Sequence, residues 1–197
     1  MNNDLNLDKD FWSQRYKSNE TGWDLGVVSP PLKAYIDQLS DKNLRILIPG
    51  CGNSYEAEYL LEKGFTNISV IDIAPEPVNR LRDKFKTDPS IQIIQADFFT
   101  HLGEYDLILE QTFFCALDPK LRESYVEAMS GLLTKGGKLA GLLFNKEFEQ
   151  QGPPFGGTTA EYLKLFADKF DFITFELCYN SFHKRDGSEH FIILRKK

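Results

Sequence analysis

Short apolar runs alternate along the chain with segments in which apolar residues recur three and four positions apart. The runs are rich in Ile, Leu and Val and have the length of strands, whereas the spacing between them is that of helices with one buried face. Five such runs occupy residues 44–48, 68–72, 91–98, 105–110 and 138–144. Strands that alternate with helices predict a parallel sheet covered by helices, which is an α/β fold.

The helical segments carry recognisable start and stop residues. Asn53 or Ser54 is expected to cap the helix after the first strand, and Thr158 with Glu161 forms a capping box for the last helix. The pair Gly136-Gly137 is expected to end the helix before the fifth strand. Further helices are predicted over residues 8–16, after Pro30-Pro31, after Pro75 and after Asp118-Pro119.

The chain ends in two β-prone runs, 172–182 and 190–195, joined by a polar, glycine-containing turn. Such a hairpin adds antiparallel strands at the edge of a parallel sheet. We therefore expect one domain over residues 1–197, with a Rossmann-like core over 43–197 and a segment of its own over 1–42. The core is predicted to be a mostly parallel seven-stranded sheet with a C-terminal antiparallel hairpin.

The first strand ends in a turn with two glycines, Gly50 and Gly52. Because glycine has no Cβ, the backbone there can approach a ligand beyond the carboxyl end of the strand, where open α/β sheets bind theirs. A dinucleotide-binding turn requires a third glycine where this chain has Tyr55. The pattern favours S-adenosylmethionine, which has no phosphate, over a pyrophosphate cofactor. A plain tight turn is the alternative.

Acidic residues follow the second and third strands. Asp72 lies about 20 residues past the glycines, where a carboxylate can accept hydrogen bonds from ribose hydroxyls. Asp97 is followed by Phe98, a pair that suits an adenine whose amino group donates to an acid and whose face lies on a phenyl ring. Each acid alone is explained equally well as a helix cap or a solvated loop residue. Their order on successive strands favours an adenosyl site.

Three large aromatic residues precede the first strand. Trp12 and Tyr16 are four positions apart on a predicted helix, and Trp23 lies between two glycines. The core could fold without them. Either they pack beneath the sheet or they form a lid over the cofactor, and the pattern alone does not choose.

Composition and net charge limit the kinds of molecule that the protein is expected to bind. The 197 residues are 42% hydrophobic, and the net charge of −6 weighs against a nucleic-acid partner. No apolar run is long enough to span a bilayer, and the opening Met1-Asn2-Asn3-Asp4 is polar, unlike a leader peptide. We therefore expect a cytoplasmic protein that does not bind membranes. A monomer is the default expectation. The three cysteines and three histidines lack the spacing of a metal site, so no metal is predicted.

With these residues in place, the sequence resembles the thiopurine S-methyltransferase family, and most of all its halide/thiol methyltransferase branch. The matching pieces, in chain order, are Phe11-Trp12 with Tyr16, Gly22-Trp23-Asp24-Leu25-Gly26, Pro49-Gly50-Cys51-Gly52, Asp97-Phe98-Phe99, Thr112-Phe113-Phe114-Cys115-Ala116 and Gly152-Pro153-Pro154. They span nearly the whole chain. The resemblance implies a Rossmann-like class I methyltransferase fold, with a helical lid over residues 1–42.

The resemblance also implies a set of site residues. Those beside S-adenosylmethionine would be Trp12, Tyr16, Trp23, Gly50, Gly52, Asp72, Asp97, Phe98 and Gln111. Those around the methyl acceptor would be Trp23, Glu110, Phe113 and Phe114. Gln111 stands where the branch usually has a tyrosine and Glu110 where it has an aspartate, so these two departures leave the acceptor open.

The chemistry expected is methyl transfer to a small soft nucleophile: a thiol, bisulfide, thiocyanate, halide or thiopurine-like heterocycle. Displacement at a sulfonium methyl needs alignment and a dry pocket rather than a strong base, so no catalytic residue is required. If Glu110 acts as a base, an O- or N-methyltransferase is the alternative. A nicotinamide-dependent oxidoreductase and a cofactor-binding regulatory module without turnover are the others.

Overall fold

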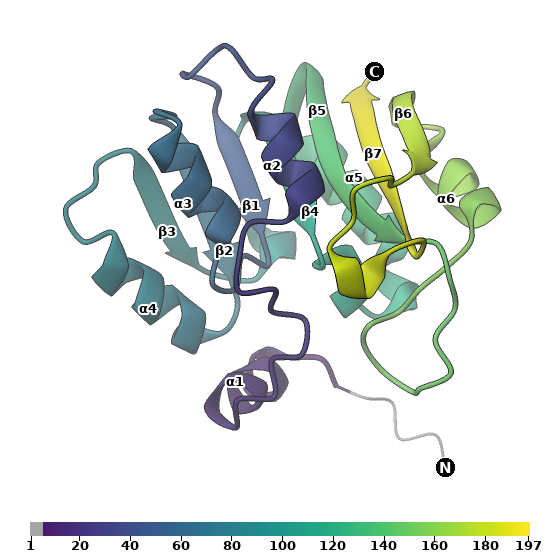
Figure 1. Cartoon of the computed structure of the whole chain (residues 1–197), viewed down its shortest axis with the longest axis horizontal. Coiled ribbons are helices and arrows are strands. Elements are labelled where there is room, and N and C mark those ends of the chain that lie inside the picture. The colour runs from purple at the N-terminus through teal and green to yellow at the C-terminus, as the bar shows by residue number, and fades with distance from the viewer. Residues whose placement is uncertain (1–5) are drawn as a thin grey trace.

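The computed structural model describes residues 6–197, so the opening Met1-Asn2-Asn3-Asp4 lies outside the described residues. One seven-stranded sheet has the order β3-β2-β1-β4-β5-β7-β6 (Figure 1). Its strands are β1 (Ile46–Pro49), β2 (Ile68–Asp72), β3 (Ile91–Gln95), β4 (Tyr105–Gln111), β5 (Leu133–Phe144), β6 (Phe170–Leu177) and β7 (Glu189–Lys196). The first five strands pair in parallel, and β7 pairs antiparallel with both β5 and β6. The mostly parallel sheet with its C-terminal hairpin is confirmed.

Helices cover both faces of the sheet. The α-helices are α1 (Lys9–Lys17), α2 (Pro30–Ile36), α3 (Tyr55–Glu62), α4 (Pro75–Lys84), α5 (Arg122–Leu132) and α6 (Thr159–Phe166). Alternate residues of β1 face opposite layers: Ile46 and Ile48 pack in a cluster with residues of α2, α3 and α4, whereas Leu47 packs in a cluster with residues of α5 and α6. A parallel strand buried on both faces explains why these runs are continuously apolar.

Several predicted boundaries move. Ser54 takes the N-cap position of α3, but its backbone is left-handed and its side chain caps nothing, so the capping bond predicted there is wrong. The prediction that Gly136-Gly137 end the helix before the fifth strand is wrong. Helix α5 ends at Leu132 and β5 begins at the next residue, so both glycines lie inside an irregular stretch of the strand. The Thr158–Glu161 capping box is confirmed.

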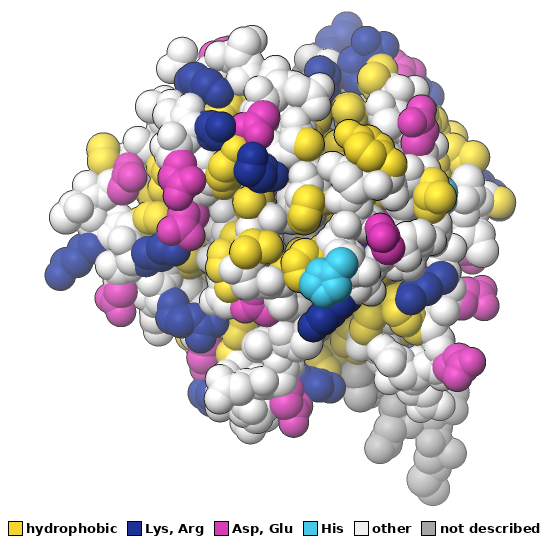
Figure 2. All heavy atoms as spheres, viewed as in Figure 1, with side chains coloured by type: hydrophobic (Ala, Val, Ile, Leu, Met, Phe, Trp, Pro, Cys, Tyr) yellow, Lys and Arg dark blue, Asp and Glu magenta, His cyan; other side chains and the backbone are white. Residues whose placement is uncertain are grey.

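The face of the molecule in Figure 2 has no large patch of like charge. Figure 2 shows lysine and arginine side chains interspersed with aspartate and glutamate, with hydrophobic side chains in small clusters between them. Across residues 6–197, none of the helices has the length and apolarity needed to cross a membrane.

Candidate cofactor site

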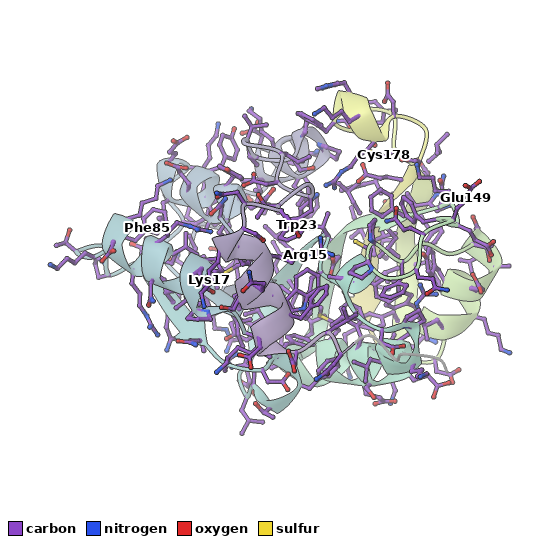
Figure 3. The ribbon with its side chains drawn as sticks, turned by 90° about the horizontal axis from the view of Figure 1, so that it is seen from below. Arg15, Lys17, Trp23, Phe85, Glu149 and Cys178 are labelled. Atoms are coloured by element: carbon purple, nitrogen blue, oxygen red, sulfur yellow. The ribbon has the colours of Figure 1, made fainter. Side chains whose placement is uncertain are left out.

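A cavity of about 700 Å³ opens at the carboxyl edge of the parallel strands. Residues at or just past the tips of β1, β2, β3 and β4 line it, together with residues of α1. Seen from below, α1 crosses this edge, with Arg15 and Trp23 near the middle of the view (Figure 3). The topology therefore gathers residues far apart in the sequence around one space.

Asp72 lies at the tip of β2, in the wall of this cavity. One carboxylate oxygen accepts from the Gly52 N–H at 3.0 Å and the other accepts from the Ala74 N–H at 2.9 Å. Burial raises the pKa of this carboxyl, and the two backbone bonds oppose that rise. Each oxygen retains a lone pair, so the carboxylate can still accept from a ligand hydroxyl.

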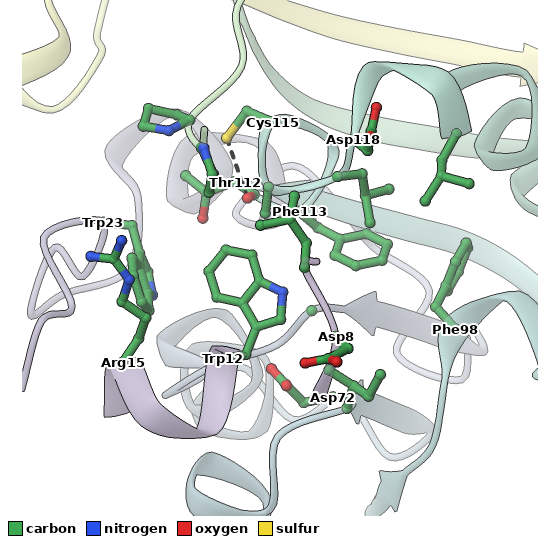
Figure 4. A pocket seen from close by; sticks show the side chains of 18 of the residues that line it. Asp8, Trp12, Arg15, Trp23, Asp72, Phe98, Thr112, Phe113, Cys115 and Asp118 are labelled. Carbon is green, nitrogen blue, oxygen red and sulfur yellow. Dashed lines mark hydrogen bonds between the residues drawn. The ribbon is translucent and has the colours of Figure 1, made fainter. Parts of the chain in front are cut away.

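Asp97 and Phe98 follow β3 and also line the cavity. Asp97 is exposed and accepts from the Phe99 N–H at 2.9 Å, which starts a short 3₁₀ turn. The Phe98 ring is buried and lies 5.1 Å from the Phe113 ring, centroid to centroid. Figure 4 shows Phe98 across the cavity from Trp23.

The glycine turn is crowded from within the protein. Gly50 has a positive φ of 55°, and a Cβ built on it would meet the Phe113 ring at 2.3 Å. The close approach predicted for this glycine is therefore made in part by Phe113, whose ring lies against the turn. Both residues line the cavity.

The early aromatic residues lie at the cavity and not beneath the sheet. Trp12 projects into its middle (Figure 4), and the Trp23 ring contacts Trp12 and Tyr16 edge to face, at centroid distances of 5.5 and 5.7 Å. The helix that carries Trp12 and Tyr16 is held on α4, where the Ser13 hydroxyl donates to the Glu76 carboxylate at 2.6 Å. The alternative that these residues plug the underside of the sheet is wrong.

Glu110 and Phe114 lie outside this cavity, which corrects their expected place at the acceptor. Glu110 is fully buried: one oxygen accepts from the N–H groups of Phe113 and Phe114, and the other accepts from the Tyr125 hydroxyl at 2.7 Å. Burial raises the pKa of this carboxyl to about 7. The Phe114 ring points into the core, 4.9 Å from Tyr125. The loop after β4 turns back over the strand tip and encloses both side chains.

Gly52 and Gln111 line a second, smaller cavity of about 50 Å³, and are not among the residues that line the first. It lies between the glycine turn and the loop that follows Trp23. Trp23, Gly50 and Thr112 line both cavities, so the two adjoin.

Sequence analysis missed Arg185, which it placed in a simple turn. Its guanidinium donates to the Trp23 carbonyl at 2.8 Å, pairs with Glu189 at 3.3 Å and lines the larger cavity. Topology was the available signal: the start of β7 pairs with Phe144 at the carboxyl end of β5, so the loop before β7 must reach this edge. Pro153 and Pro154 also line the cavity, as expected from their place after β5.

The residues present fit an adenosyl cofactor. The cavity has the volume of a cofactor pocket, aromatic walls and a buried carboxylate with free lone pairs. Cys115 lines it as well, but its thiol donates to the Thr112 carbonyl and burial raises its pKa to about 12, which argues against a nucleophile. Within the described part of the chain, no cluster of three or more His, Cys, Asp or Glu side chains could hold a metal ion.

Comparisons with known proteins identify the family of this chain. The family model for thiopurine S-methyltransferase matches residues 7–192. A probable thiol methyltransferase 2 from Arabidopsis thaliana is 33% identical over 159 residues, which is 78% of this chain and 70% of that protein. A thiopurine S-methyltransferase from Vibrio parahaemolyticus is 29% identical over 178 residues, 81% of this chain and 82% of that protein.

A solved structure extends the comparison to the fold. The 1,6-didemethyltoxoflavin-N1-methyltransferase of Burkholderia thailandensis, with bound S-adenosylhomocysteine, superposes with a TM-score of 0.75 at 18% identity, covering 96% of this chain and 87% of that one. The fold is that of the class I methyltransferases. With the family model matching nearly its whole length, this chain belongs to the thiopurine S-methyltransferase family of S-adenosylmethionine-dependent methyltransferases.

Proposed function

We propose that this protein transfers the methyl group of S-adenosylmethionine to a small soft nucleophile: a thiol, bisulfide, thiocyanate, halide or thiopurine-like heterocycle. The observation that carries the proposal is the larger cavity itself. Its walls are mainly apolar and aromatic, and none of the described residues that line it is a histidine. Such a pocket excludes water and suits a soft acceptor that needs no general base.

The residues at the strand tips have separate tasks in this proposal. Asp72 accepts from the ribose hydroxyls, and Asp97 and Phe98 hold the adenine. When bound, S-adenosylmethionine supplies an electrophilic methyl group on a positively charged sulfur. The faces of Trp12, Trp23 and Phe113 attract that positive charge and exclude water from the nucleophile.

The segment before β1 acts as a lid. Its aromatic residues cover the cavity, and two hydrogen bonds tie its loop to opposite sides of the site. The Asn53 amide donates to Asp24 beside the glycine turn, and Arg185 donates to the Trp23 carbonyl beside β7. Held on both sides, the lid closes the site over a bound cofactor and aligns the acceptor with the methyl group.

We further infer that the protein works as a single-domain monomer in the cytoplasm, on a freely diffusing acceptor rather than on nucleic acid or at a membrane. The net charge of −6 weighs against a nucleic-acid partner, and the three buried, unpaired cysteines fit a reducing compartment. Light scattering after size exclusion tests the monomer, and a second copy in the eluted particle would contradict it.

A labelled-methyl assay tests the function. Purified protein is incubated with methyl-labelled S-adenosylmethionine and, side by side, iodide, thiocyanate, bisulfide, an aryl thiol, a thiopurine, a catechol and a primary amine. We expect label in one or more of the first five products. Labelling of the catechol or the amine alone would contradict the proposal, as would silence across the panel with tight S-adenosylhomocysteine binding.

A further inference from the structure

Two different sets of contacts hold the segment before β1 over the cavity, one at helix α1 and one at the loop that follows it. We propose that only α1 moves when the cofactor enters and leaves, and that Glu76 is the positioning residue that holds this helix in place. The loop over residues 23–29 stays fixed. The inference rests on the proposed function, because it names the part of the lid that opens.

The loop is tied to the body of the protein at buried charged groups. The Trp23 carbonyl accepts from the buried Arg185 guanidinium at 2.8 Å, and Arg185 in turn pairs with the buried Glu189 of β7. Further along, the Ser29 N–H donates at 3.1 Å to the buried carboxylate of Glu56 in α3. Hydrogen bonds to charged groups shielded from water are the stronger kind, so this loop is expected to stay in place.

Helix α1 is held by contacts that lie nearer the surface. The Ser13 hydroxyl donates to one carboxylate oxygen of Glu76 at 2.6 Å, and the ammonium of Lys17, a largely exposed side chain, lies 3.4 Å from the same oxygen. The Arg80 guanidinium lies over the Tyr16 ring, 5.2 Å from its centroid. Among the described residues, none from α1 belongs to either core cluster. The helix can therefore leave its place without opening the core.

Glu76 is suited to releasing the helix as well as to holding it. Its second carboxylate oxygen is shielded from solvent and accepts no hydrogen bond from any described residue. When α1 lifts, water reaches this oxygen, and that gain offsets part of the loss of the Ser13 bond. The three side chains of Ser13, Lys17 and Glu76, which we call the latch, thus separate a closed and an open state by a small free energy.

The passage of a cofactor requires such an opening. Ligands of open α/β sheets enter at the carboxyl edge of the strands, which is the edge that α1 crosses (Figure 3). Trp12 projects into the middle of the cavity (Figure 4), where its ring lies 5.5 Å from the Trp23 ring. A nucleoside therefore reaches the strand tips when Trp12 moves away with its helix.

The stretch between α1 and Trp23 has the features of a hinge. In the described part of the chain, residues 18–22 make hydrogen bonds only to residues 14–16 and 24. Asn19 turns the chain at the end of the helix with a positive φ of 56°, and a Cβ built on Gly22 would meet no atom within 4 Å. A loosely packed connection of this kind can absorb the dihedral changes that swing α1 away while the loop stays fixed.

Stopped-flow tryptophan fluorescence with S-adenosylhomocysteine tests the latch in Ser13→Ala and in Glu76→Ala. The latch contacts lie wholly within the protein, so they oppose entry and exit alike. Both variants should raise the association and the dissociation rate constants by about 5- to 30-fold, the effect of losing one hydrogen bond to a charged group. The dissociation constant should change by less than about twofold, because a contact made equally with and without ligand does not alter affinity.

Ser18→Ala is the matched control. It removes the same hydroxyl at the end of the same helix, where that group donates only to the Gln14 carbonyl, and its rate constants should equal those of the wild type. A rise in the dissociation rate constant alone would show a binding contact and overturn the latch. Unchanged rate constants, or an equal rise in the control, would also overturn it. Failure of the wild type to bind S-adenosylhomocysteine would instead overturn the proposed function.

Hydrogen exchange followed by mass spectrometry tests whether α1 moves alone. The helix has nine residues, too few to be stable away from the surface on which it docks. In Ser13→Ala its amides should exchange about 5- to 30-fold faster than in the wild type, while those of residues 24–29 keep their wild-type rates. Faster exchange in both segments would mean that the whole lid opens as one unit, and would overturn the fixed loop.

Discussion

The tips of β2 and β4 carry acids that look alike in the sequence and do different work in the structure. Asp72 and Glu110 are both buried, and each accepts from two backbone N–H groups. Asp72 nevertheless faces the larger cavity, whereas Glu110 is enclosed by its own loop and by Tyr125. The difference lies in the path of the chain after each strand. After β2 the chain leaves Asp72 open to a ligand, whereas after β4 it folds back so that Glu110 binds the loop.

The loop that Glu110 holds is itself part of the site. Phe113 and Cys115 line the larger cavity, and the Phe113 ring lies against Gly50. Glu110 therefore contributes through the shape of the pocket and not through contact with the acceptor. The substitutions below separate these two uses of a strand-tip acid.

The largest expected effect is on folding, at the β4 tip. Glu110→Leu leaves the N–H groups of Phe113 and Phe114 and the buried Tyr125 hydroxyl without an acceptor, so the free energy of unfolding should fall by about 3 to 6 kcal/mol. Urea unfolding measures it, with the exposed Glu123→Leu on α5 as control. A loss below about 1 kcal/mol would mean that these donors find other partners.

The next effect is a pH dependence of stability. The pKa of Glu110 is about 7 in the folded protein against 4.5 for the free side chain, so the folded state holds the proton more tightly. The stabilisation is complete below pH 4.5 and is lost as the pH rises through about 7, for a total of roughly 3 kcal/mol. Urea unfolding of the wild type and of Glu110→Gln from pH 5 to 8 measures this loss. The free energy of unfolding should fall more steeply with pH in the wild type than in the variant. Parallel curves would contradict a titrating Glu110.

At the β2 tip the expected effect is on binding. Asp72→Ala should weaken the binding of S-adenosylhomocysteine by about 1 to 3 kcal/mol, because a charged acceptor for the ribose is lost. Asp72→Asn keeps the shape, but its amide oxygen can accept from only one of the Gly52 and Ala74 N–H groups, so this variant should also bind S-adenosylhomocysteine more weakly. Calorimetry measures both, and an unchanged affinity in Asp72→Ala would place the ribose elsewhere.

The smallest effect is expected at the β3 tip. Asp97 is exposed, so water competes for its hydrogen bonds. Asp97→Ala should therefore weaken the binding of S-adenosylhomocysteine by only about 0.5 to 1 kcal/mol. The same calorimetric series measures it. A loss larger than that of Asp72→Ala would reverse the ranking of the two tips.

The sequence predicted what depends on local pattern. Strand runs, the capping box at Thr158 and the order of glycines, Asp72 and Asp97 follow from periodicity and from the rule that parallel strands end at one edge. The sequence could not predict the enclosure of Glu110, because that depends on a tight turn with a positive φ at Thr112. Arg185 was missed for a related reason: its contact with Trp23 joins residues 162 positions apart.

Tryptophan fluorescence tests the central claim most directly, because the chain has two tryptophans and both line the larger cavity. Titration with S-adenosylhomocysteine should give a saturable change in emission that Asp72→Ala shifts to higher ligand concentration, while NADH should give none. No response to S-adenosylhomocysteine, or saturable quenching by NADH, would contradict an adenosyl-methionine site at the strand tips.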